Sequence, residues 1–123
     1  MLRPSNKELF GKLRSAKSAL ENDCVFLIDQ DVIAEDAIEL GYDIGSDLFK
    51  ILAELFEETA PTHYAGSRPP QRSYKQNIEG LELFPFVVDS QRFKCRVYFK
   101  FAIAEGSLWL VSLHQDRPKE ESP

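Results

Sequence analysis

The spacing of hydrophobic and polar positions changes along this chain, from a helical period in the first half to a period of two in the second. In residues 6–21 apolar side chains recur every three or four positions, and Ser5 followed by Glu8 matches a capping box at the start of this run. Similar runs follow, and Gly41 is suited to end the second one. The pattern predicts three helices: residues 6–21, Asp29 or Asp31 to Gly41, and about Ser46 to before Pro61.

Strands are expected elsewhere. The apolar segment CVFLI (Cys24–Ile28) predicts a short buried strand, or an extended entry to the second helix, between the first two helices. Residues 59–75 contain three prolines and no apolar period, which indicates a loop, and alternation then predicts strands at 81–88, 93–103 and 107–115. Helices followed by an antiparallel sheet indicate a single α+β domain over residues 1–117, with a frayed tail at 118–123.

The strand FKCRVYFKF (Phe93–Phe101) alternates strictly, so one face is apolar and the other is polar. We expect a three-residue hairpin loop, Ala104–Gly106, because that register keeps Phe99 opposite Val111 and the apolar face continuous. The same register sets Phe101 opposite Trp109 in the core. On the polar face it predicts three cross-strand pairs: Arg96 with His114, Tyr98 with Ser112, and Lys100 with Leu110.

Charge is unevenly distributed over the 123 residues. The whole chain carries −5, but residues 1–62 carry −7 whereas residues 63–100 carry +4. A phosphate-binding site in the basic segment is therefore compatible with the acidic average. No apolar run is long enough to span a membrane and no signal peptide is evident, so a cytoplasmic protein without a membrane partner is expected. Cys24 and Cys95 have no ligand spacing, which indicates reduced, apolar residues and no metal.

The polar face carries groups that together suit cleavage of RNA without a metal or other cofactor. His114 can move protons near neutral pH, Tyr98 can donate a hydrogen bond or a proton, and Arg96 can bind phosphate. The alternation is also ordinary for a one-sided antiparallel sheet, and from the pattern alone a solvated surface is the more common interpretation. The residue types thus define a candidate site and leave both interpretations open.

Three short motifs carry a family resemblance: IELGYD (Ile38–Asp43) at a helix end, VYFKF (Val97–Phe101) and LVSLH (Leu110–His114). In order and spacing the chain resembles the motility quorum-sensing regulator toxins of the RelE-like superfamily of toxin-antitoxin ribonucleases. The resemblance implies an α+β fold with a curved antiparallel sheet, RNA cleavage without a metal, and neutralisation by an antitoxin protein. The residue types of the polar face suit cleavage by attack of a ribose 2′-hydroxyl on the adjacent phosphate.

The resemblance also implies site residues. Tyr98 matches the family's strand tyrosine, and His114 stands where the family has a lysine, which replaces a fixed cation by an acid-base group. His63 is offered for a second family lysine, whereas the family's strand glutamine has no clear counterpart near Leu81–Phe86. The acidic N-terminal half departs from a family whose members are commonly basic.

The expected site comprises four catalytic residues, Tyr98, Arg96, His114 and His63, and six residues that contact RNA, Lys94, Lys100, Ser112, Arg68, Arg72 and Lys75. The loop cations are about as well explained by solvation as by phosphate binding. Two other functions stay open: a non-catalytic module that binds nucleic acid or protein through the basic sheet face, and an interaction protein that acts through acidic helix residues such as Glu35 and Glu39.

Overall fold

The three predicted helices and four predicted strands are all present in the computed structural model, which describes residues 3–116. The helices are α1 (Asn6–Glu21), α2 (Gln30–Leu40) and α3 (Leu48–Glu58), with short 3-10 helices η1 (Pro61–His63) and η2 (Gln76–Ile78). The strands are β1 (Val25–Leu27), β2 (Phe84–Ser90), β3 (Cys95–Ala104) and β4 (Ser107–Gln115). The predicted α+β class is confirmed; the tail expected at 118–123 lies outside the described residues.

The helix boundaries follow from their capping residues. Ser5 Oγ accepts a hydrogen bond from the Glu8 N–H at 3.1 Å, as predicted, and this bond satisfies one free donor at the start of α1. The Glu8 carboxylate pairs with Arg3. At the end of α2, Gly41 has a φ of 86°, a conformation that glycine adopts without steric cost.

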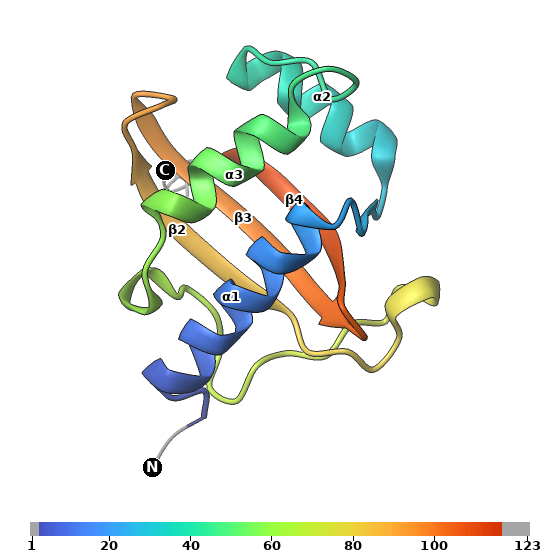
Figure 1. The fold of residues 1–123 in the computed structure, drawn as a ribbon, viewed down its shortest axis with the longest axis vertical. Helices are drawn as coiled ribbons and strands as arrows, with labels where there is room; N and C mark the ends of the chain where they lie inside the picture. The colour runs from blue at the N-terminus through green and yellow to red at the C-terminus, as the bar shows by residue number, and fades with distance from the viewer. Residues whose placement is uncertain (1–2, 117–123) are drawn as a thin grey trace, which may run out of the picture.

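The sheet has the strand order β1-β4-β3-β2, and α1 and α3 lie across one of its faces (Figure 1). Strands β2, β3 and β4 form an antiparallel meander, whereas β1 pairs with β4 in parallel. The expectation of a purely antiparallel sheet is therefore wrong, because the chain passes from β1 through α2 and α3 before it returns to the sheet. Among residues 3–116, no helix is long and apolar enough to cross a membrane.

Aromatic side chains fill the space between the helices and the sheet. Phe56 of α3 meets Phe99 and Phe101 of β3 edge-on, with ring centroids 5.6 Å apart in each case. Phe86 of β2 stacks on both β3 rings, and all four side chains are fully buried. Each buried phenylalanine stabilises the fold by about 1.5–3 kcal/mol, so this cluster holds β2 and β3 against the helical layer. The predicted apolar face of β3 is thereby confirmed.

The hairpin between β3 and β4 turns over two residues, Glu105 and Gly106, and not over the three that the sequence predicted. Their φ angles are 50° and 80°. Positive φ at both central residues is the geometry of a type I′ turn, which matches the twist of the flanking strands. Gly106 adopts a positive φ without steric cost, whereas a positive φ is sterically unfavourable for Glu105.

A β-bulge changes the register further along this hairpin. Phe101 pairs with Leu110, but the preceding residue, Lys100, pairs with Ser112, so Val111 is the extra residue. The pairings that depended on the three-residue loop are therefore wrong: Arg96 with His114, Tyr98 with Ser112, Lys100 with Leu110, Phe99 with Val111, and Phe101 with Trp109.

The bulge has a physical reason in the composition of β4. Residues 108–111 are all apolar, so their pattern fits either face of the sheet. With one extra residue, the side chains of Leu108, Leu110 and Leu113 are all buried on the helix side. Trp109, expected in this core, lies on the opposite face, where it stacks on Phe26 of β1 with ring centroids 4.7 Å apart.

We call the sheet face directed away from α1 and α3 the outer face. Near the end of β4 it carries Tyr98 opposite His114, and two residues along β3 it carries Lys100 opposite Ser112. At one end it is covered by the segment that contains η2, because Ile78 and Leu83 pack there against Ala102, Trp109 and Val111. The candidate site lies on the outer face beyond this covered end.

Candidate active site

Tyr98 of β3 and His114 of β4 form the centre of the candidate site. They occupy directly opposed positions in the antiparallel ladder. Their rings are stacked, with centroids 5.0 Å apart and planes inclined by 19°. The sequence predicted both residues in the site but with other partners. The two-residue turn and the bulge at Val111 together set them opposite one another.

A backbone hydrogen bond determines the tautomer of His114. Its Nδ1 lies 2.9 Å from the carbonyl oxygen of Gln115. A carbonyl oxygen only accepts, so Nδ1 carries the proton and donates it. In the neutral ring, Nε2 therefore holds the lone pair and is the nitrogen that can take up a proton.

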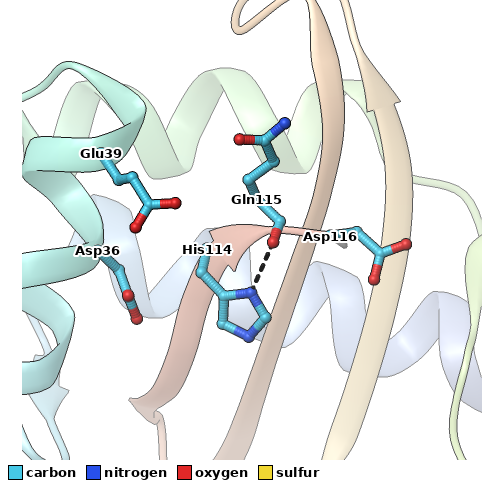
Figure 2. Close-up of a pocket in the computed structure, with 5 residues that line it drawn as sticks. All are labelled: Asp36, Glu39, His114, Gln115 and Asp116. Carbon is cyan, nitrogen blue, oxygen red and sulfur yellow. Dashed lines mark hydrogen bonds between the residues drawn. The ribbon is translucent and has the colours of Figure 1, made fainter. Parts of the chain in front are cut away.

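His114 lines a hollow of about 250 Å³ together with carboxylates from two elements. Figure 2 shows Asp36 and Glu39 projecting from α2 toward the end of β4, where Gln115 and Asp116 complete the lining. Three carboxylates and one imidazole make this hollow acidic. It is therefore poorly suited to hold several phosphates.

Tyr98 is half-buried between its neighbours on the outer face. Burial raises the pKa of the Tyr98 phenol, and the Asp116 carboxylate raises it further. Both effects disfavour the phenolate, because burial removes solvation and the carboxylate repels a second negative charge. Tyr98 consequently remains protonated at neutral pH and available as a hydrogen-bond donor.

A second hollow, of about 390 Å³, adjoins the first at Asp116, which lines both. Arg96 and His63 also line this second hollow. Arg96 Nε lies 3.7 Å from Asp116 Oδ2, and the Arg96 carbonyl accepts a hydrogen bond from the Asp116 N–H at 2.8 Å. The structure thus brings three of the predicted catalytic residues, Tyr98, His114 and Arg96, to neighbouring positions. His63 lines the second hollow together with Arg96.

His63 is held in the opposite tautomer to His114. Its Nδ1 lies 2.9 Å from the backbone nitrogen of Ala60, which donates the hydrogen bond. Nδ1 must therefore be unprotonated, and in the neutral ring Nε2 carries the proton. Protonation of the ring would break the bond to Ala60, so His63 is better suited to donate a hydrogen bond from Nε2 than to shuttle protons.

The predicted RNA-contacting residues divide into two groups. Lys100, opposite Ser112 in the ladder, lines a third hollow of about 180 Å³ with Arg72 and Lys75. Arg72 Nη1 donates to the Gly80 carbonyl at 2.9 Å, and Lys75 Nζ pairs with Asp29 Oδ2 at 2.7 Å. These cations are therefore gathered on the outer face around Lys100, which lies two residues along β3 from Tyr98.

The other two predicted RNA-contacting residues lie apart from that group. Arg68 places its guanidinium 5.2 Å from the Tyr64 ring centre and donates to the Pro4 carbonyl, which indicates a role in holding the loop. Lys94 was expected on the strand, but it lies in the turn before β3 with a φ of 55°. It lines a further hollow, of about 410 Å³, which it shares with Arg96.

Sequence reasoning missed the carboxylates around the site. Asp36 lies on a predicted helix face, where charged residues are common, and Asp116 directly follows the last predicted strand. The position of Asp116 directly after His114 and Gln115 was the available signal. Asp36 reaches the site only because α2 packs beside β4, a contact that no local pattern specifies.

Comparison with known proteins adds no family assignment. No protein-family model matches the chain, and no curated protein matches it. Within residues 3–116, no three His, Cys, Asp or Glu side chains are grouped so as to hold one metal ion. The functional argument consequently rests on the residues of the outer face.

Proposed function

We propose that this protein is an endoribonuclease of RelE-like fold, the toxin of a toxin-antitoxin pair, which cleaves RNA through attack of a ribose 2′-hydroxyl on the adjacent phosphate. The observation that carries the proposal is the stacked pair of Tyr98 and His114 on an accessible sheet face. Beside this pair stands Arg96, and the α+β order of elements is compatible with the family resemblance of the sequence.

The tautomers and charges of these residues assign a role to each. His114 Nε2 accepts the proton of the 2′-hydroxyl while the O2′–P bond forms. The P–O5′ bond breaks, and the leaving 5′-oxygen takes a proton from the Tyr98 phenol. Tyr98 then regains a proton from solvent, and His114 releases to solvent the proton that it accepted. Arg96 stabilises the added negative charge on the phosphate oxygens, and His63 donates a hydrogen bond from Nε2.

The variants that test these roles are His114→Ala and Tyr98→Phe. Each should reduce the rate of RNA cleavage by roughly a hundredfold or more, the usual cost of a lost acid-base group. Tyr42→Phe is the matched control: it removes the hydroxyl of a buried tyrosine on the other side of the sheet and should leave the rate unchanged. The rate is measured on a fluorescent RNA oligonucleotide at fixed salt.

A result in which both site variants cleave as fast as the wild-type chain contradicts the assigned roles. Toxicity provides a second readout, since expression of the wild-type chain should arrest growth and expression of the His114→Ala variant should not.

One observation favours a different function. The hollow around His114 is lined by Asp36, Glu39 and Asp116, and this acidic lining opposes the approach of a polyanion. A binding module that holds nucleic acid or an acidic protein only through its cations would show salt-sensitive binding and no cleavage product at any pH. Product formation therefore separates the two functions.

A further inference from the structure

We infer that the third hollow, with Tyr74 at its rim, is a nucleotide subsite for single-stranded RNA: Tyr74 stacks on a base, and Lys100, Arg72 and Lys75 hold the flanking phosphate. The inference rests on the proposed function for the identity of the polymer. It concerns binding outside the Tyr98/His114 pair and adds Tyr74, a residue that the sequence did not single out.

The charge of this hollow is the first argument. Three cations line it, and no carboxylate is among the described residues that do so. Lys75 is paired with Asp29 Oδ2 at 2.7 Å, so a phosphate would share this cation with that carboxylate, and Lys100 and Arg72 carry most of the argument. Among residues 3–116, Lys100 makes no ion pair, and Arg72 is engaged only by a carbonyl and keeps further N–H groups to offer. The hollow around His114 has the opposite character, so an RNA strand would be attracted to the cationic hollow and would only touch the acidic one.

Tyr74 provides the second argument. Its side chain is 93% exposed, which is unusual for a large aromatic residue. The backbone beside Tyr74 is nevertheless well anchored by the preceding residue, Ser73, which is buried. The Ser73 N–H donates to the Leu81 carbonyl at 2.9 Å, and the Ser73 Oγ accepts from the Lys75 N–H at 2.9 Å. An exposed ring on an ordered backbone loses little entropy when it stacks on a base.

The ladder relates this subsite to the cleavage site. Lys100 and Ser112 stand two residues along their strands from Tyr98 and His114, a separation of roughly 7 Å. This is similar to the spacing of successive phosphates in an extended single strand. The phosphate at Lys100 would therefore be the neighbour of the phosphate that is cleaved.

The test measures binding with cleavage chemically blocked. The probe is a fluorescein-labelled 2′-O-methyl RNA octamer of mixed sequence, which has no 2′-hydroxyl to attack, and its affinity for the full chain is measured by fluorescence anisotropy. Tyr74→Ala should weaken binding about tenfold, and Tyr74→Phe should restore it because the ring is retained. Lys100→Ala should weaken binding and reduce the slope of log Kd against log salt by about 0.7.

Matched controls lie on α3, on the far side of the sheet. Phe49→Ala removes an exposed aromatic ring, and Lys50→Ala removes an exposed cation, and both should bind as the wild-type chain does. A duplex form of the same RNA should bind independently of Tyr74, because its bases are already stacked.

Several outcomes overturn the subsite. These are wild-type affinity in both Tyr74→Ala and Lys100→Ala, failure of the wild-type chain to bind the octamer, or a polyglutamate peptide that competes with equal affinity and the same dependence on Tyr74. Cleavage of unmodified RNA that depends on His114 would uphold the proposed function in each of these cases. Conversely, Tyr74-dependent binding without any cleavage would uphold the subsite and overturn the nuclease.

Discussion

Two tyrosines in this protein, Tyr98 and Tyr42, are partly or fully buried, and burial has a different consequence for each. Burial raises the pKa of Tyr98, and the phenol faces the site, where a protonated hydroxyl is useful. Burial, with a contribution from Asp36, raises the pKa of Tyr42 to about 12, and its hydroxyl lies in the core without a hydrogen-bond partner in the described part of the chain. The same physical cause thus gives a functional group in one case and a stability cost in the other.

We predict that Tyr42→Phe stabilises the protein by about 1 kcal/mol at neutral pH, because it removes an unsatisfied buried hydroxyl. The free energy of unfolding of the wild-type chain should fall above pH 10, since the unfolded tyrosine loses its proton there while the folded one keeps it to about pH 12. This group contributes at most about 1.4 kcal/mol per pH unit. Denaturant unfolding of both chains at pH 7.5 and 11 measures the effect; an equally steep fall in the variant would contradict it.

At the scale of elements, the β3–β4 hairpin determines the site. Its tight turn and the bulge at Val111 together set Tyr98 against His114, whereas either feature alone would leave a different residue opposite. The turn is strained at one position, since Glu105 has a φ of 50°. The hairpin therefore contains Glu105, which disfavours the turn, although the proposed function depends on the register that this turn helps to set.

Glu105→Asn should relieve this strain, because Asn-Gly is the preferred pair for a type I′ turn. We expect a gain of about 0.5–1 kcal/mol in the free energy of unfolding, seen as a higher melting temperature in a thermal scan. RNA cleavage should be unchanged, since the residue lies at the far end of the hairpin from His114. A lower melting temperature would show that the turn is not of this type.

Sequence patterns located the elements of this protein well and their partners poorly. The helices and strands were predictable because cores impose periods of 3.6 and two, and Val97, Phe99 and Phe101 are buried as that period requires. The hairpin register was not, because a run of apolar residues at 108–111 satisfies either face and a bulge leaves no local mark.

The composition of the candidate site was predictable in part for the same reason. Tyr98, His114 and Arg96 belong to the polar face of regular strands, which alternation identifies. The carboxylates of Asp36 and Asp116, and the exposed ring of Tyr74, depend on how separate segments pack. Parallel pairing of β1 with β4 likewise depends on contacts between residues about eighty positions apart.

In the molecule as a whole, the topology distributes carboxylates and cations to different parts of the sheet. Helices α1 and α3 cover one face of the sheet (Figure 1). Helix α2 brings the carboxylates of Asp36 and Glu39 to the end of β4, whereas the cations Arg72, Lys75 and Lys100 line one hollow on the outer face. Under the proposed function, the outer face would hold a single RNA strand at the cationic subsite and present one phosphate to Tyr98 and His114.

The chemical ends of the cleavage products test this account most directly. An RNA oligonucleotide is incubated with the purified chain without added metal, the products are analysed by mass spectrometry, and the same oligonucleotide with one 2′-deoxy nucleotide at the cleaved position serves as control. We predict 2′,3′-cyclic phosphate and 5′-hydroxyl ends, loss of cleavage at the 2′-deoxy position, and loss of cleavage in His114→Ala. Products with 5′-phosphate ends, or cleavage that persists at the 2′-deoxy position, would contradict it.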